Sequence, residues 1–221
     1  TSGTTGRPKG VVYHHRGAYL MTMGTVISWR MVLNPVFLAI VPLFHCNGWN
    51  HTWMMPVLGG TVVCCRDISA KAIYDAIADQ RVTHFGGAPI VLNLIVNAKD
   101  EERRSFDHRV EVFTAGAPPA PATLAGIESL GFNVTQVYGL TETYGHITEC
   151  LWDDLAWDGL PQAEKAIIKA RQGVAMPMME DVTVLDKNLK QVPMDGATQG
   201  EIMIRGNAVM KGYFKNPEAT A

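Results

Sequence analysis

The segment VFLAIV, residues 36–41, is an unbroken apolar run that lies between Pro35 and Pro42. Such a run is typical of a strand buried on both faces of a parallel sheet, because a half-exposed strand would alternate apolar and polar residues. TVVCC, residues 61–65, repeats the pattern directly after a Gly-Gly pair. We therefore expect two inner strands of an α/β sheet.

Helical and strand-like segments alternate along the chain up to about residue 172. Residues 69–81 carry apolar side chains at helical spacing, and Ser69 is a suitable N-cap. Similar patterns predict strands at 84–85, 110–114 and 134–138, and helices at 16–31, 89–97 and 121–130. This order predicts a doubly wound, mostly parallel sheet with helices on both faces and with ligand sites at the carboxyl ends of its strands.

The pattern changes after Gly173. Residues 182–185 and 200–205 have the alternation of an antiparallel hairpin. We therefore expect residues 1–172 to form an α/β subdomain that is incomplete at its N-terminus, and residues 173–221 to begin a β-rich subdomain.

The composition is that of a globular chain. Of its 221 residues, 47% are apolar and 18% are charged, and the net charge of -2 disfavours the broad basic surface that nucleic-acid binding needs. The longest apolar run, residues 35–44, contains two prolines and is far shorter than the roughly 20 residues that span a bilayer. We therefore expect no nucleic-acid partner, no transmembrane segment and a cytoplasmic location.

The cysteines and histidines suggest neither a disulfide nor a metal site. No cysteine pair has CxxC spacing, and Cys64 and Cys65 would point to opposite faces of a strand. His45, Cys46 and His51 lie close together in sequence, but no second ligand pair follows at zinc-finger spacing. We therefore expect these residues to serve another purpose.

The segment TSGTTGRPKG, residues 1–10, is rich in glycine and hydroxyl side chains and carries Lys9. Its backbone N–H groups, hydroxyls and cation suit a polyphosphate. It is not a Walker A loop, because that pattern has four residues between its glycines and then Gly-Lys-Ser/Thr. On composition alone, a flexible turn remains the alternative to a phosphate site.

A second motif, YGLTET at residues 138–143, directly follows a predicted strand. This position puts the hydroxyl of Thr141 and the carboxylate of Glu142 at the carboxyl end of the strand, where α/β sheets expose ligands. The alternative is that both residues only begin a helix.

In this order, the two motifs resemble those of the adenylate-forming superfamily, which includes acyl-CoA synthetases, luciferases and peptide-synthetase adenylation domains. The segments at 42–49 (PLFHCNGW), 114–119 (TAGAPP), 171–177 (RQGVAMP) and 200–220 (GEIMIRGNAVMKGYFKNPEAT) also look like successive motifs of that family. The resemblance spans essentially the whole chain. It implies an ATP-dependent acid–thiol ligase that activates a carboxylic acid as acyl-AMP and transfers it to coenzyme A, with Mg²⁺ as cofactor.

The resemblance also implies roles for individual residues. The opening loop would hold the β- and γ-phosphates of ATP with Lys9, Thr141 would contact the α-phosphate, and Glu142 would help to hold Mg²⁺. His45 and Trp49 would border the acyl pocket, and a hydrogen-bonded wall residue is the alternative for His45. The remaining nucleotide-binding candidates are Thr1, Ser2, Gly3, Thr4, Thr5, Gly6, Gly116, Ala117, Pro118, Tyr138 and Gly139, with Tyr138 stacked on the adenine.

Two parts that such enzymes need are not in these 221 residues: an aspartate for the ribose hydroxyls, expected just beyond Ala221, and a small C-terminal domain with a catalytic lysine. We therefore expect a central fragment of a synthetase that does not complete the reaction alone. Residues 149–171 resemble an insertion in ligases for short- or medium-chain fatty acids and for 3-methylmercaptopropionate, and the last of these is the substrate we favour.

Two alternatives stay open. An amino-acid or aromatic-acid adenylating domain is one, although its amino-acid form predicts an aspartate in the acyl pocket, and residues 42–49 contain none. The other is a nucleotide-binding module without chemistry of its own. The expected partners are a small carboxylic acid, ATP and coenzyme A, and a homodimer is compatible with the sequence.

Overall fold

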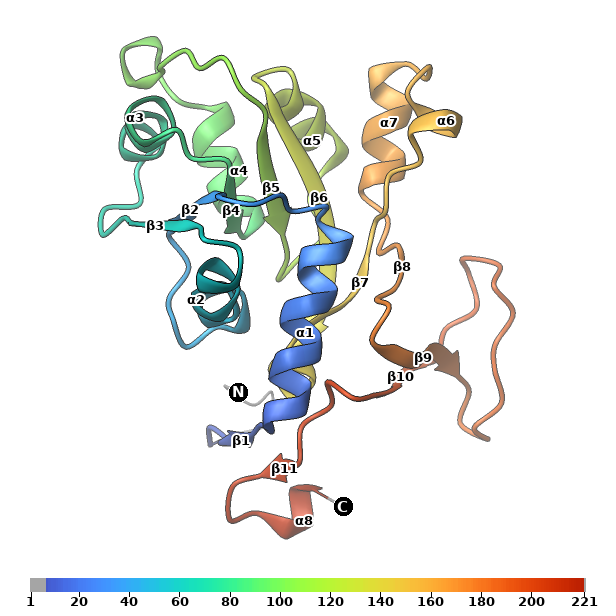
Figure 1. Cartoon of the computed structure of the whole chain (residues 1–221). Helices are drawn as coiled ribbons and strands as arrows, with labels where there is room; N and C mark the ends of the chain where they lie inside the picture. The colour runs from blue at the N-terminus through green and yellow to red at the C-terminus, as the bar shows by residue number, and fades with distance from the viewer. Residues whose placement is uncertain (1–6, 221) are drawn as a thin grey trace.

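The central element of the computed structural model, which describes residues 7–220 without the side chains of Asn47 and Trp49, is a seven-stranded sheet (Figure 1). The strand order is β3-β2-β4-β5-β6-β7-β8, in which β3 to β6 are parallel and β7 and β8 are antiparallel. The strands are β2 (Val36–Ala39), β3 (Thr61–Cys64), β4 (His84–Gly87), β5 (Val110–Thr114), β6 (Phe132–Leu140), β7 (Gly145–Glu149) and β8 (Val174–Ala175). The predicted α/β fold with a mostly parallel sheet is confirmed.

Helices cover both faces of this sheet (Figure 1). Neighbouring residues Phe37 and Leu38 of β2 belong to different hydrophobic clusters, because successive side chains of a strand point to opposite faces. Phe37 packs with residues of α1 and α2, and Leu38 packs with α3, α4 and α5. The main helices are α1 (His15–Ser28), α2 (Cys46–Val57), α3 (Ala70–Gln80), α4 (Pro89–Val96), α5 (Pro121–Glu128) and α7 (Gln162–Lys169), with single turns at η1 (Asp100–Glu102), η2 (Thr141–Thr143), α6 (Asp154–Trp157) and α8 (Pro217–Thr220).

Two features of the sheet and its helices differ from the sequence expectations. Strand β3 is not an inner strand: it lies at the edge of the described sheet, and three of its four residues are exposed. β-Branched residues favour a strand whether or not both of its faces are covered, so the Val-rich pattern could not distinguish the two positions. Helix α2 was not expected, because Gly48 and Pro56 lower its intrinsic helix propensity. Burial of Met54 and Met55 against the sheet stabilises it instead.

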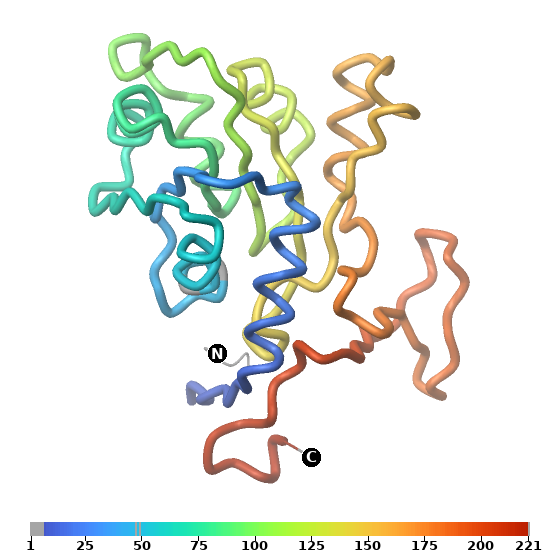
Figure 2. Tube along the Cα trace, viewed as in Figure 1, coloured from blue at the N-terminus to red at the C-terminus, as the bar shows by residue number. Residues whose placement is uncertain are grey.

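Two small antiparallel pairs complete the chain. Strands β9 (Met179–Leu185) and β10 (Glu201–Gly206) form the expected hairpin. Strands β1 (Val11–Val12) and β11 (Gly212–Tyr213) pair with each other, so the blue and red ends of the trace lie side by side (Figure 2). This long-range pair brings Tyr213 next to the segment that carries Lys9. The subdomain boundary at residue 173 stays a prediction.

None of the helices in residues 7–220 is both long enough and apolar enough to cross a bilayer.

Candidate active site

The loop after β5 and the end of β6 meet at the carboxyl edge of the sheet. Thr114 pairs with Gln136, so the loop at residues 116–118 lies beside Tyr138. Gly116 has a φ of +90°, and a Cβ at this position would meet no heavy atom within 4 Å. The exposed backbone of this loop therefore has open space in front of it, which is what a nucleotide base needs in order to approach closely.

Gly139 is required by strand packing. A β-bulge between Tyr138 and Gly139 interrupts the β6–β7 ladder. A Cβ on Gly139 would lie only 1.9 Å from the carbonyl oxygen of Gly145. Because Gly139 has no Cβ, β7 can approach β6 closely and the chain can continue into η2. Strand packing alone therefore explains a glycine at this position, which was predicted to bind the nucleotide.

Thr141 and Glu142 form the single turn η2 directly after β6, as their sequence position predicts. The hydroxyl of Tyr13 donates a hydrogen bond to the carbonyl oxygen of Thr141 at 2.7 Å. The buried hydroxyl of Thr143 accepts from the N–H of Leu140 and lies 2.8 Å from the carbonyl oxygen of Gly145. These contacts fix the turn in position.

Lys9 and Glu142 both contact the side chain of Tyr213. The hydroxyl of Tyr213 donates to Oε1 of Glu142 at 2.8 Å, and the ammonium of Lys9 lies 4.3 Å from the centre of the Tyr213 ring. The Glu142 carboxylate raises the pKa of Tyr213, because it is the hydrogen-bond acceptor of the protonated phenol. A cation and a carboxylate are thus gathered at one end of the sheet, although 133 positions separate them in the sequence.

No role was predicted for Tyr213, although it lies within the recognised motif at residues 200–220. Only the pairing of Val11 with Tyr213 brings it to the site. A pairing between two-residue strands so far apart leaves no periodic signal in the sequence.

A cavity of about 60 Å³ is lined in part by Gly139 and Tyr144, which lie on the two sides of the η2 turn in the sequence. It is adjacent to the candidate nucleotide site, because Ala115 precedes Gly116 and Gly139 lies two positions before the first residue of the η2 turn. We call it the inner cavity. It is lined by Cys46, Asn50, His51, Ala115, Val137, Gly139, Tyr144, Gly145 and His146.

Two ionisable groups that the sequence did not single out are buried near this cavity. Burial lowers the pKa of His146 to about 4, so its ring is neutral at pH 7. Nε2 of His146 lies 4.0 Å from Oε2 of Glu149, and burial raises the pKa of that carboxyl. The ring of His146 also meets that of Phe113 edge to face, with a centroid distance of 4.9 Å. The lining of the inner cavity therefore includes a neutral imidazole ring, which packs against the ring of Phe113.

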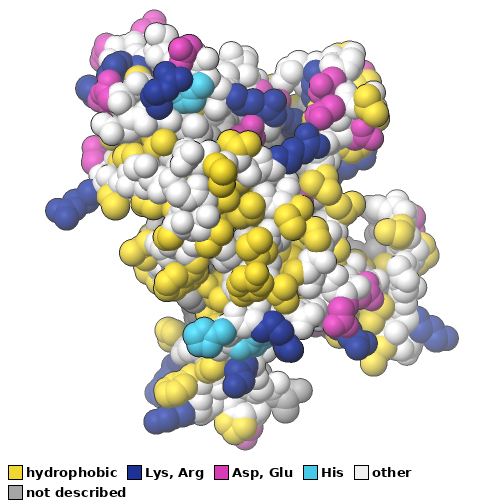
Figure 3. Space-filling view, in the orientation of Figure 1, with side chains coloured by type: hydrophobic (Ala, Val, Ile, Leu, Met, Phe, Trp, Pro, Cys, Tyr) yellow, Lys and Arg dark blue, Asp and Glu magenta, His cyan; other side chains and the backbone are white. Residues whose placement is uncertain are grey.

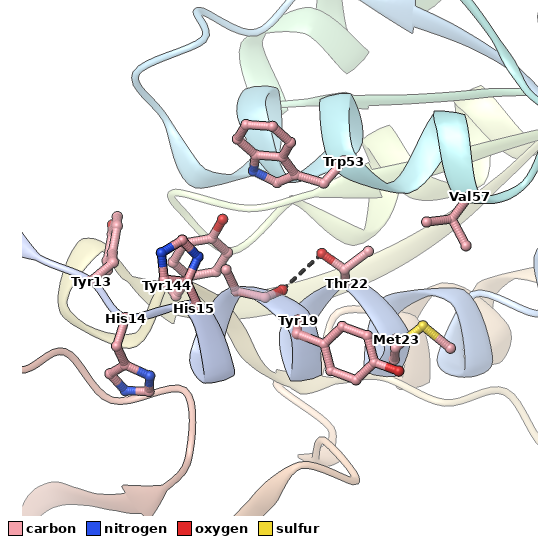
Figure 4. Close-up of a pocket in the computed structure, with 10 residues that line it drawn as sticks. Tyr13, His14, His15, Tyr19, Thr22, Met23, Trp53, Val57 and Tyr144 are labelled. Carbon is pink, nitrogen blue, oxygen red and sulfur yellow. Dashed lines mark hydrogen bonds between the residues drawn. The ribbon is translucent and has the colours of Figure 1, made fainter.

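A larger pocket of about 480 Å³ opens between α1 and α2 (Figure 4). Its wall is mostly aromatic and aliphatic, and hydrophobic side chains gather over the middle of this face of the molecule (Figure 3). We call it the outer pocket. It is lined by Tyr13, His14, His15, Ala18, Tyr19, Thr22, Met23, Trp53, Val57 and Tyr144.

His45, Trp49 and the residues of the opening loop are the remaining predicted site residues. His45 is the N-cap residue of α2; it is exposed, and its ring lies 4.6 Å from that of Phe44. The adjacent Cys46 lines the inner cavity, whereas a role for His45 stays a prediction. The side chain of Trp49 and the whole of residues 1–6 lie outside the described residues.

A comparison with protein families matches residues 1–214 to the AMP-binding enzymes. The chain belongs to the AMP-binding enzyme family.

Among curated relatives of this AMP-binding enzyme, the acetate/butyrate–CoA ligase AAE7 of Arabidopsis thaliana, named as peroxisomal, is 51% identical over 99% of the chain. The peroxisomal trans-cinnamate:CoA ligase of Petunia hybrida is 48% identical over the whole chain. The chain covers 39% of the length of each. The structure of o-succinylbenzoate coenzyme A synthetase from Bacillus subtilis in complex with ATP and a magnesium ion matches all of the chain and 43% of its own, with 25% identity and a TM-score of 0.79.

Proposed function

We propose that the enzyme to which this chain belongs is an ATP-dependent acid–CoA ligase that acts on short carboxylic acids. The observation that carries the proposal is the contact of both Lys9 and Glu142 with Tyr213, near a small cavity. The charged groups Lys9 and Glu142 suit a polyphosphate and its metal ion. The cavity suits a small organic group. Membership of the AMP-binding family and the names of the relatives support the same reaction class.

In the first half-reaction, a carboxylate oxygen attacks the α-phosphorus of ATP, and pyrophosphate leaves. The carboxylate is already ionised at pH 7, so this step needs no general base. It needs neutralised phosphate charge and in-line placement. Lys9 would neutralise the leaving phosphates, Thr141 would contact the α-phosphate, and the loop at residues 116–118 would hold the adenine against Tyr138.

In the second half-reaction, the sulfur of coenzyme A attacks the acyl carbon of the adenylate, a thioester forms, and AMP leaves. The acyl group would remain in the inner cavity during both steps. The buried position of this cavity would protect the reactive mixed anhydride from water.

The residues around Glu142 fit a magnesium ion that is held jointly by protein and substrate. No cluster of three His, Cys, Asp or Glu side chains is found among the described residues. Mg²⁺ commonly binds through one or two carboxylates together with phosphate oxygens and water. Glu142 would supply the protein ligand, and the ion would neutralise phosphate charge.

The substrate class rests on the cavity and on the relatives. The acetate/butyrate ligase is similar to this chain over 99% of the chain's length. Within the class of short acids, 3-methylmercaptopropionate remains the one we favour, because of the resemblance of residues 149–171. A cytoplasmic location is also kept as a proposal, against which the peroxisomal names of relatives weigh.

A panel of acids tests this function in the full-length enzyme. Acetate, butyrate, 3-methylmercaptopropionate, benzoate and alanine are compared for acid-dependent release of pyrophosphate and for formation of a CoA thioester. We expect the short aliphatic acids to be used best. Release of pyrophosphate with alanine only, or with no acid, would contradict the proposal.

A further inference from the structure

Tyr144 is the one described residue that lines both the inner cavity and the outer pocket. It follows η2 directly, and its side chain is 1% exposed. Figure 4 shows its ring among the residues of α1 and α2 that surround the outer pocket. Tyr144 is therefore part of the wall that divides the two spaces.

The ring is held firmly in this wall. It meets the ring of Tyr13 edge to face, with a centroid distance of 4.5 Å. Tyr13 is itself fixed by its hydrogen bond to the carbonyl oxygen of Thr141. Met21 and Ala208 pack in the same buried cluster. The backbone of Tyr144 has a φ of +62°, a left-handed conformation that aims the ring at this position and that a glycine would adopt without strain.

The two spaces differ in size. The inner cavity of about 60 Å³ has about one eighth of the volume of the outer pocket, so it suits only a small acyl group. Acetate has four heavy atoms and butyrate has six. An acid as long as hexanoate would extend beyond the inner cavity and would have to enter the apolar outer pocket of about 480 Å³.

We propose that Tyr144 sets the chain-length limit of the acid substrate, by closing the inner cavity against the apolar outer pocket. The inference rests on the proposed function, because it takes the inner cavity as the acid site. Removal of the ring would join the two spaces and would let an alkyl chain of six or more carbons lie along Tyr19, Met23 and Val57 of the outer pocket.

The test compares Tyr144→Gly and Tyr144→Phe with the wild-type full-length enzyme. Acid-dependent pyrophosphate release is measured with acetate, butyrate, hexanoate and octanoate. A buried methylene is worth about 0.8 kcal/mol, which is about a fourfold effect. We expect wild-type kcat/KM to fall steeply from butyrate to hexanoate, with 3-methylmercaptopropionate, which has seven heavy atoms, at the limit. In Tyr144→Gly the ratio of kcat/KM for hexanoate to that for butyrate should rise at least about tenfold, whereas Tyr144→Phe keeps the ring and should keep the discrimination.

The outcomes separate this inference from the proposed function. Absence of pyrophosphate release with every acid in the wild-type enzyme would overturn both. Wild-type activity on octanoate equal to that on butyrate would overturn the chain-length limit alone. A folded Tyr144→Gly enzyme with an unchanged acid profile would also overturn the chain-length limit alone. So would a Tyr144→Gly enzyme in which only the KM for coenzyme A changes. If Tyr144→Gly fails to fold, Tyr144→Asn, which also tolerates the left-handed backbone, replaces it with the same expected shift.

Discussion

The hydroxyl of Tyr213 donates a hydrogen bond of 2.8 Å to Oε1 of Glu142, across 71 residues of sequence. The backbone carbonyl of Glu142 also accepts a hydrogen bond from the N–H of Met210, at 2.8 Å. The segment that leads into β11 is therefore attached to η2 at two points. Because β11 pairs with β1, these contacts also set the position of Lys9 relative to Glu142.

Tyr213→Phe should weaken the use of MgATP. The substitution removes the hydrogen bond to Glu142 but keeps the ring beneath Lys9. A hydrogen bond to a charged group is worth about 1.5–3 kcal/mol, and partial exposure reduces this, so we expect kcat/KM for ATP to fall about tenfold. Tyr74→Phe is the matched control, because Tyr74 lies in the core between the sheet and α3 to α5, and it should leave the rate unchanged. Equal effects of the two substitutions would show that the contact with Glu142 is not used.

Gly139→Ala should disrupt the β6–β7 ladder. The new methyl group would meet the backbone of Gly145 and His146, which cannot give way as a flexible side chain does. We expect a loss of at least about 2 kcal/mol in the free energy of unfolding, measured by urea denaturation. Gly159→Ala is the control: a Cβ there meets nothing within 4 Å and its φ is not positive, so stability should change by less than about 0.5 kcal/mol. A stable Gly139→Ala protein would refute the packing account of the bulge.

Acidification should destabilise the protein through His84. Burial lowers its pKa to about 4, below the ordinary value near 6.5, so the unfolded chain binds more protons than the folded one between these pH values. The stability that the neutral His84 contributes is therefore fully present above pH 6.5, and it is lost as the pH falls towards 4. We expect about 1–2 kcal/mol less stability at pH 5 than at pH 7 from this group.

Urea denaturation of wild type and His84→Gln at both pH values measures this contribution. The variant should lose less stability on acidification. His146 acts in the same direction, and Glu149, whose pKa is raised by burial, acts in the opposite one, so both remain in the variant as a common background. Equal pH dependence of the two proteins would contradict a neutral buried His84.

The sequence predicted the sheet better than it predicted the site. Strand β5 has the predicted bounds, residues 110–114, and all of its residues are buried except the half-buried Glu111. The edge position of β3 depends on which strands lie beside it, and that information is not contained in four residues. The position of Thr141 and Glu142 at the end of β6 could be predicted because a strand precedes them directly. Tyr213, Tyr144 and His146 could not be singled out, because long-range packing and burial bring them to this end of the sheet.

Lys9→Ala in the full-length enzyme tests the central claim most directly. Acid-dependent pyrophosphate release is compared with that of Lys187→Ala, an exposed lysine in the turn between β9 and β10. Loss of one charge-stabilising group in such a site typically costs a factor of about 10²–10³ in rate, so Lys9→Ala should fall by at least about 100-fold while Lys187→Ala stays at the wild-type rate. An unchanged rate in Lys9→Ala would contradict the assignment of this end of the sheet to the phosphates of ATP.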